Sequence, residues 1–289
     1  MICNWIGKQI SADSHNEKGW ALVLEPPGPL DDARRKHIAD AVGMDLIDVK
    51  VRVNGNGYTF LKKSVDPWEI GRYASNLDEY GFNPILFDLN GAFEPPDPIS
   101  VVSATCSVSG ARFSSEKNEI IHIGRSNTML AVLGTIEVVE KNLVTQKDVP
   151  VVLYGSIIAR TSKKESASRN VKTEGVADIY FLEENKCFRI SQRNFNFQTA
   201  IDDSGSFNFS KNLYSLLKKL DALCENAIVD DSFENSTLPY PSAGDEKSNK
   251  SVSDSFNYQT MTEVVVKMSA FDHYSRFIHN VRMKNKTQY

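Results

Sequence analysis

The alternation of apolar and polar positions predicts the first half of a β-α-β-β-α-β unit at residues 20–53. Residues 20–24 form an unbroken apolar run, which indicates a short strand. Residues 30–42 carry apolar side chains at helical spacing, and Gly43 follows where a left-handed helix end is expected. Residues 47–53 then alternate strictly between apolar and charged positions, which predicts a strand with one buried face.

The second half of the unit is predicted to repeat this order. Residues 54–62 begin with Asn-Gly-Asn-Gly, a strong hairpin signal, and continue as a returning strand. Asp66 before Pro67 predicts a helix start, because Asp caps the first turn and Pro is tolerated at the first helical position. Residues 85–89 form the last strand. Residues 20–92 are therefore predicted to be a ferredoxin-like βαββαβ domain, with both helices on one face of a four-stranded antiparallel sheet.

The turn Pro27-Gly28-Pro29-Leu30 and the later Gly43-Met44-Asp45-Leu46 resemble the ACT family of small-molecule regulatory modules, which share the ferredoxin-like fold. In that family a P-G-x-L turn opens the first helix, and here Asp45-Leu46 stands where the family usually has Asn-Ile. The resemblance implies that an amino acid or similar small ligand binds near Pro27, Gly28 and Leu30, often at a dimer interface. The alternative interpretation is that Pro-Gly-Pro only makes a tight turn from strand to helix.

Three prolines within residues 95–98 mark a boundary, because proline cannot continue a central strand. Residues 99–227 are predicted to form a β-rich domain of roughly six or seven antiparallel strands. A helix that begins near Phe209 closes this domain. This order of elements is typical of a small barrel or a bent sandwich, and a pleckstrin-homology-like arrangement is one option. The predicted fold class of the whole chain is α+β.

The C-terminal part is predicted to be a linker followed by a helix, and residues 1–19 are an N-terminal extension. Residues 228–257 contain many acidic and serine residues and few large apolar ones, which predicts a flexible linker. Residues 258–289 are predicted to form an amphipathic helix that packs on its own chain or in a homodimer, because apolar side chains left in water promote aggregation. Binding of its face to another protein is the alternative. The packing or partner face comprises Val264, Met268, Phe271 and Ile278.

Composition narrows the class of protein. The chain has 289 residues, a net charge of −4 and 41% hydrophobic residues, which is ordinary for a soluble globular protein. The slight acidity argues against nucleic-acid binding, and no apolar stretch reaches the length of a membrane span. The N-terminus has no signal-peptide pattern, and the four cysteines form no C-x-x-C pair. A reducing, cytoplasmic location is therefore predicted.

Residues 160–172 hold the one basic concentration in the chain, between two predicted strands. Lys163, Lys164 and Arg169 are the candidate residues of an anion site for a phosphate, a lipid headgroup or a nucleic-acid backbone. The favoured interpretation is a solvated hairpin loop, because no aromatic residue lies within it to stack on a base.

No catalytic or metal motif stands out. The H-E-x-x-H, G-x-S-x-G, P-loop and G-x-G-x-x-G patterns are absent, and the five histidines have no carboxylate or cysteine at metal spacing. We therefore predict no metal, no cofactor and no catalytic residue from sequence. An enzyme whose site forms only in the fold is an alternative, with Asp178, His122 and Arg189 as candidate members.

The leading hypothesis is a non-enzymatic protein-interaction or scaffolding protein that acts through binding. Its expected partner is another protein or a second copy of the chain, contacted through the C-terminal helix. An ACT-like small-molecule sensor and an enzyme are the two alternatives. A deep pocket with convergent polar groups would favour the sensor or the enzyme, and a flat apolar patch would favour partner binding.

Overall fold

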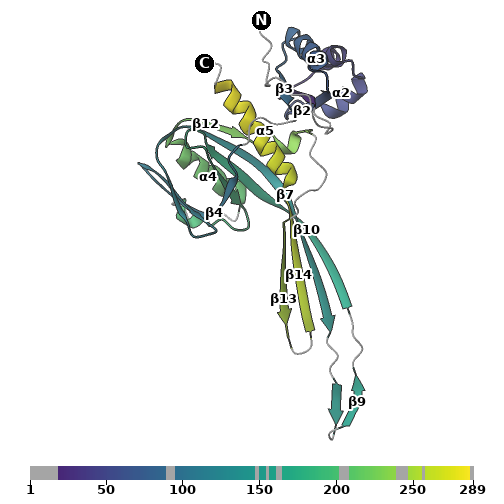
Figure 1. Cartoon of the computed structure of the whole chain (residues 1–289), viewed down its shortest axis with the longest axis vertical. Helices are drawn as coiled ribbons and strands as arrows, with labels where there is room; N and C mark the ends of the chain where they lie inside the picture. The colour runs from purple at the N-terminus through teal and green to yellow at the C-terminus, as the bar shows by residue number, and fades with distance from the viewer. Residues whose placement is uncertain are drawn as a thin grey trace, which may run out of the picture.

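The computed structural model shows a mixed α+β chain with open sheets, so the predicted fold class is confirmed at this level. The N-terminal helices lie at one end, a curved sheet with two further helices forms the middle, and a narrow group of strands projects from the other end (Figure 1). The structure describes residues 19–88, 95–146, 150–153, 156–160, 165–201, 208–238, 247–255 and 258–286.

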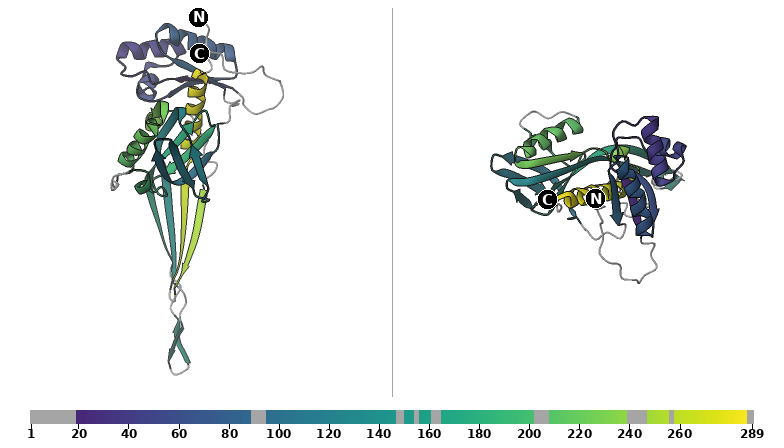
Figure 2. Two further views of the ribbon diagram at one scale, coloured as in Figure 1. Left: turned by 90° about the vertical axis from the view of Figure 1, so that its left-hand side faces the viewer. Right: turned by 90° about the horizontal axis from the view of Figure 1, so that it is seen from above.

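The N-terminal part is a three-stranded sheet with helices on one face (Figure 2). The first strand is central and antiparallel to both neighbours, so the two outer strands run parallel with the first strand inserted between them. Two predicted helix ends are confirmed: the Asp66 side chain accepts a hydrogen bond from the Trp68 amide at 2.9 Å, and Gly43 ends the first helix at φ +64°. The elements are β1 (Trp20–Leu24), α1 (Asp32–Val42), α2 (Leu46–Arg52), β2 (Thr59–Ser64), α3 (Pro67–Glu79) and β3 (Pro84–Asp88).

The predicted second strand of this unit is wrong, because its residues form the short helix α2. The Asp45 side chain accepts a hydrogen bond from the Ile47 amide at 2.7 Å and caps the helix. Val49 and Val53, four positions apart, are fully buried, whereas Ile47 and Val51 are 71% and 79% exposed. Val49 and Val53 are spaced as on one face of a helix, and only these two apolar positions of the alternating segment enter the core. The sheet therefore has three strands where four were predicted.

The remaining strands form one open sheet of nine and a separate pair, β8 with β9. The order is β13-β14-β7-β10-β11-β4-β5-β6, and β12 lies parallel beside β7. The ends of this order, β13 and β6, are not paired with each other, so the described strands do not close into the predicted barrel. The elements are β4 (Pro98–Ser107), β5 (Gly110–Ser115), β6 (Ile120–Ile123), β7 (Ser126–Gln146), β8 (Pro150–Leu153), β9 (Ser156–Arg160), β10 (Glu165–Phe181), β11 (Lys186–Ser191), η1 (Phe197–Thr199), α4 (Phe209–Asp221), β12 (Cys224–Asp230), η2 (Phe233–Asn235), β13 (Lys247–Asp254), β14 (Tyr258–Lys267) and α5 (Ser269–Lys286).

Two hydrophobic cores lie on opposite faces of β7 and β10. Helix α4 packs Leu216 and Leu220 into one core, together with Ala131 of β7. Helix α5 packs Phe271 and Ile278 into the other core, over the residues of β7 that alternate with those facing α4. The central sheet is therefore held between two helices.

The N-terminal sheet shares the core under α5. Ala21, Val23 and Tyr58 belong to that core, and the Tyr58 ring meets Phe277 edge-on with the ring centroids 5.4 Å apart. The two parts that were predicted as separate domains are thus joined by continuous apolar packing, with α5 between them.

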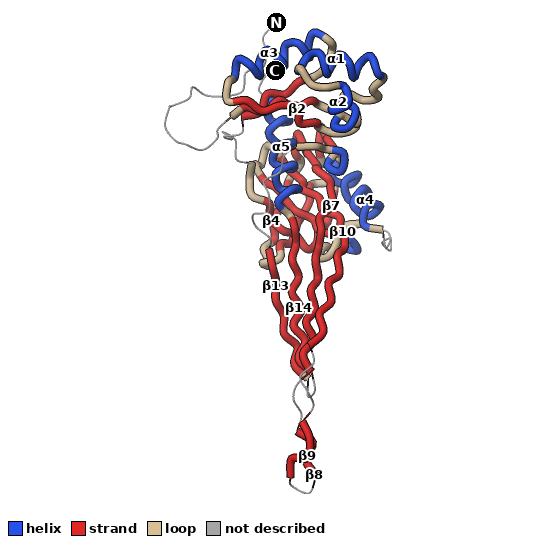
Figure 3. Tube along the Cα trace, turned by 90° about the vertical axis from the view of Figure 1, so that its right-hand side faces the viewer, coloured by secondary structure: helices blue, strands red, loops and turns tan. Residues whose placement is uncertain are grey.

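Four strands project from the two cores as an arm, which comprises residues 137–146 of β7, 165–175 of β10, and the β13–β14 hairpin (Figure 3). At the base of the arm, Val138, Val264 and Val266 still contact the core under α5. All 17 residues of β10 pair with β7, so the arm continues the central sheet without a break. At about 3.4 Å per residue, the ten arm residues of β7 span about 30 Å.

The arm corrects three predictions. Residues 165–172, predicted as a loop, belong to β10; residues 247–254, predicted as linker, form β13; and residues 258–267, predicted as the start of the helix, form β14. The distal halves of β10 and β13 are exposed on both faces, so they lack the apolar alternation that identifies a strand with one buried face. Only the later part of the predicted C-terminal helix, α5, is helical.

Replacing Phe271 with Ala is expected to lower the free energy of unfolding by about 3–5 kcal/mol, because the ring is buried and its loss leaves a cavity. Urea unfolding followed by circular dichroism measures the change. Val252→Ala is the matched control, since Val252 is 61% exposed and its truncation should cost little. Equal unfolding midpoints for the two variants would show that α5 is not docked on the sheet.

Candidate functional site

The fold brings together two of the three residues considered for an enzyme site. Asp178 of β10 and Arg189 of β11 are direct cross-strand partners, and the guanidinium donates two hydrogen bonds to the carboxylate, both at 2.7 Å. His122 lies on β6, on the exposed surface of the sheet and away from this pair. The three residues therefore do not form one site.

The Asp178–Arg189 pair belongs to a buried network under α5. Ser275 donates a hydrogen bond to Asp178 at 2.7 Å, and the Tyr180 hydroxyl lies 2.8 Å from Ser275 Oγ. Arg189 also forms an ion pair with Asp272 of α5 at 2.6 Å. Burial acts to lower the pKa of Arg189, but the attraction of the two carboxylates outweighs burial and raises this pKa above its usual value.

The groups around this network are poor acids, bases and nucleophiles. Burial raises the pKa of Tyr180 and of the Cys187 thiol, so both stay protonated at neutral pH. Burial also lowers the pKa of His279, which keeps that ring neutral. Because the ion pair is bidentate and its remaining partners come from α5, the network fixes the position of the helix.

A second buried contact holds α5 through Asp230 of β12. The Tyr274 hydroxyl donates a hydrogen bond to the Asp230 carboxylate. Burial raises the pKa of Asp230, and the hydrogen bond from Tyr274 only partly opposes that rise. The ionised form of Asp230 is thus less stable in the folded protein than in the unfolded chain.

The residues predicted as the packing or partner face of the terminal helix pack against their own chain. Phe271 and Ile278 are buried beneath α5, and Met268 and Val264 pack partly buried against the same core. Val264 belongs to β14 and not to the helix. In the structure this apolar face packs in cis.

The turn that resembles ACT modules is held by hydrogen bonds. Gly28 adopts φ +72° and its amide donates a hydrogen bond to the Gly55 carbonyl at 2.9 Å. The Arg34 guanidinium donates to the carbonyls of Pro27 and Pro29 at 3.3 and 3.1 Å. Leu30 packs against the core formed by the N-terminal helices. These contacts account for the turn as a structural element between β1 and α1.

Of the three residues predicted to form an anion site, only Arg169 lies within the described residues. Lys163 and Lys164 lie outside the described residues. Arg169 lies on the arm, exposed on β10 and directly opposite Lys141 of β7.

The face of the arm that carries Arg169 has rows of charged and apolar side chains that cross all four strands. One row comprises Lys250, Glu263, Lys141 and Arg169, in which Glu263 forms ion pairs with Lys141 at 3.3 Å and with Lys250 at 3.4 Å. These lysines lower the pKa of Glu263. The adjacent row is apolar and comprises Val252, Met261, Leu143 and Ala167.

The opposite face of the arm is rich in hydroxyl and amide side chains. Ser251, Thr262, Asn142 and Ser168 lie in register across it, and Thr262 donates a hydrogen bond to Asn142 at 2.8 Å. Among the described strands, β13 and the arm part of β10 have a neighbour on one side only. The arm is therefore a two-faced surface with distinct chemistry on each face.

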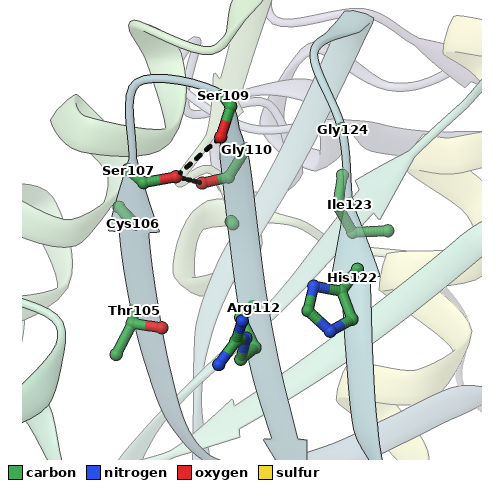
Figure 4. Close-up of a pocket in the computed structure, with 10 residues that line it drawn as sticks. Thr105, Cys106, Ser107, Ser109, Gly110, Arg112, His122, Ile123 and Gly124 are labelled. Atoms are coloured by element: carbon green, nitrogen blue, oxygen red, sulfur yellow. Dashed lines mark hydrogen bonds between the residues drawn. The ribbon is translucent and has the colours of Figure 1, made fainter.

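A pocket of about 410 Å³ opens on the outer face of β4, β5 and β6 (Figure 4). Thr105, Arg112 and His122 lie in it, together with the turn that joins β4 to β5. Ser107 donates a hydrogen bond to the Gly110 carbonyl at 3.0 Å and lies 3.2 Å from Ser109 Oγ.

Sequence reasoning missed both surfaces. The arm could have been found from the strand-compatible β-branched residues within residues 136–146 and 258–267, read as one long hairpin system instead of as separate short elements. The pocket could have been found from the absence of Asp and Glu in three successive strands that contain one Arg and one His.

Comparison of the chain with protein-family models, with curated proteins and with solved structures finds no match. Within the described ranges, no cluster of three His, Cys, Asp or Glu side chains is arranged to hold a metal ion. In the same part of the chain, no helix combines the length and apolar character needed to cross a membrane.

Replacing Arg189 with Gln is expected to lower the free energy of unfolding by about 3–5 kcal/mol, because Asp178 would keep a buried charge without its guanidinium. The double variant Asp178→Leu with Arg189→Met should recover much of this loss. Urea unfolding measures both. Lys267→Gln is the control: it breaks the exposed ion pair with Glu137 and should cost less than about 1 kcal/mol. A loss for Arg189→Gln no larger than the control would contradict the structural role of the network.

Asp230 is expected to make stability fall as pH rises. Its pKa in the folded protein is raised above the usual 3.8, so the folded state holds this proton more tightly than the unfolded state does. The free energy of unfolding therefore decreases as pH rises from about 4 to the folded-state pKa and then levels off. In Asp230→Asn this trend should be absent. Unfolding curves from pH 4 to 8 test the difference, with exposed Asp48→Asn correcting for the loss of one charge.

Proposed function

We propose that this protein is a non-enzymatic protein-interaction or scaffolding protein that binds a partner across the face of its arm that carries Met261. The observation that carries the proposal is the apolar row of Val252, Met261, Leu143 and Ala167, which crosses an otherwise solvated four-stranded sheet. Val252 is 61% exposed and Met261 is 38% exposed. No described element covers this part of the arm (Figure 3).

Such an arm gains little stability from folding alone. A sheet exposed on both faces buries little apolar surface, and burial is the main favourable contribution to folding. An apolar row on that sheet contributes much more when a partner covers it, by about 1.5–3 kcal/mol for each large side chain that becomes fully buried. The ion-paired row of Lys250, Glu263 and Lys141 beside it would fix the orientation of the partner.

The proposal replaces the predicted interaction surface but keeps the predicted kind of function. The face of the C-terminal helix packs on its own chain, so the arm is the more accessible surface for a partner. Cytoplasmic location is part of the proposal and is supported by the free cysteines among the described residues, Cys106, Cys187 and Cys224.

A second candidate function is small-molecule sensing at the turn that resembles ACT modules. One observation favours it: a Cβ atom added at Gly28 would meet nothing within 4 Å, so space lies beside this turn. The N-terminal part would then be a variant of the ferredoxin-like arrangement in which α2 replaces a strand. The arm remains the stronger proposal, because the carbonyls of Pro27 and Pro29 already accept hydrogen bonds from Arg34.

A photo-crosslinking amino acid placed at position 261 is expected to form one discrete adduct with a polypeptide in cells that make the protein naturally. The same amino acid at position 168, on the opposite face of the arm, should not form this adduct. Mass spectrometry of the adduct identifies the partner, and a second copy of the chain is one of the outcomes.

The purified complex then tests the apolar row. Met261→Lys should weaken binding about tenfold or more, because a charge would replace buried apolar surface. Ser168→Lys, a control on the opposite face, should leave the affinity unchanged. Absence of an adduct at position 261, or equal weakening by both variants, would reject the arm as the binding surface.

A further inference from the structure

The pocket on β4, β5 and β6 gathers three polar side chains in one row. Thr105 is directly opposite Arg112, and Arg112 is directly opposite His122, so the row crosses all three strands. The alternate residues, Ala104, Ala111 and Ile123, are buried in the core below. Directly opposite side chains in antiparallel strands have Cβ atoms about 4.5–5.5 Å apart, so the three polar groups can contact one small ligand together.

The charge of this surface has one sign. The sequences of β4, β5 and β6 contain no Asp or Glu, and Arg112 and His122 are their two basic residues. Within the part of the chain that the structure describes, no hydrogen bond or ion pair occupies the Arg112 guanidinium. Arg193, by contrast, forms ion pairs with two carboxylates, those of Glu140 and Glu174.

The turn that joins β4 to β5, at one end of the pocket, adds hydroxyl groups. Ser107 and Ser109 lie at the rim of the pocket, 3.2 Å apart, and Ser107 donates to the Gly110 carbonyl (Figure 4). Gly110 lets β5 start close to β6, because a Cβ atom there would lie 2.3 Å from the Ile123 carbonyl oxygen. The register of β5 with β6 places Arg112 directly opposite His122.

We propose that this pocket binds the oxyanion group, a phosphate or a carboxylate, of a small molecule. Arg112 supplies the charged fork of donors that matches two oxygens of such a group. His122 and the hydroxyl of Thr105 supply the further contacts to that group, and Ser107 and Ser109 line the other end of the pocket. The volume of about 410 Å³ leaves room for a small organic body beside the anionic group.

Isothermal titration with inorganic phosphate, sulfate and acetate tests this site on the full chain. At least one of these anions should bind with a saturable isotherm, and Arg112→Gln should weaken that binding about tenfold, because hydrogen bonds to a charged group are lost. The ranking of phosphate against acetate distinguishes a phosphate ligand from a carboxylate ligand.

Arg125→Gln is the matched control, because Arg125 is exposed nearby but does not line the pocket. It removes the same charge and should leave the affinity unchanged. His122→Gln should give a smaller loss than Arg112→Gln. No saturable binding of any of the three anions, or equal weakening by Arg112→Gln and Arg125→Gln, would overturn the proposal. The pocket strands and the strands of the arm lie at opposite sides of the sheet order, and no residue is shared between them, so the two proposals fail or succeed independently.

Discussion

The continuous pairing of β7 with β10 is the constraint on which the rest of the molecule depends. Residues 176–181 of β10 pair with β7 between the two cores, and residues 165–175 continue the same ladder into the arm. At the junction, Gly134 of β7 and Gly175 of β10 lie one position out of register. A Cβ atom at Gly134 would come within 2.7 Å of Phe271, and one at Gly175 within 2.3 Å of Phe209. Aromatic rings carried by α5 and α4 thus rest directly on the backbone where the sheet leaves the cores.

Docking of α5 is the second requirement, because this helix lies between the central sheet and the N-terminal sheet. Apolar packing stabilises the docked helix, and the buried ion pair of Asp178 and Arg189 fixes its position on the sheet. Ser275 and Asp272 of α5 reach this pair on adjacent turns of the helix, so a shift of α5 along its axis would leave a buried charge with fewer partners. An apolar face alone tolerates such a shift more easily, since hydrophobic contacts are not directional.

The parts of the fold that were predictable from sequence are those with one buried face. The helix α3 was predictable because Asp66 and Pro67 mark its start and its apolar positions recur at helical spacing. The helix α2 was not, because its seven residues alternate like a strand, and only tertiary packing selects Val49 and Val53 for burial. Strand β13 was not predictable, because its Lys, Ser and Asn residues on both faces are equally compatible with a linker. Only its pairing with β14 makes this segment a strand.

The candidate sites likewise depend on pairings that local sequence does not determine. Asp178 and Arg189 were recognisable as polar residues within apolar strands, but their pairing depends on the β10–β11 register, which local sequence does not determine. The arm and the pocket depend on the lateral order of strands, so the rows of Met261 with Leu143 and of Arg112 with His122 exist only after the sheet has formed.

The composition of the arm also favours binding across its face over pairing at its edges. An open edge recruits other strands indiscriminately, and proteins oppose this with charged and polar residues on edge strands. In this arm β13 and β10 are the edge strands and carry Lys250 and Arg169, whereas the large apolar residues Leu143 and Met261 lie on the central strands β7 and β14. The edge strands thus carry charge, which discourages non-specific strand addition. The apolar row of Val252, Met261, Leu143 and Ala167 crosses the face from one edge strand to the other, so only a partner that lies on the face covers it completely. That distribution is what a specific, face-on interaction surface requires.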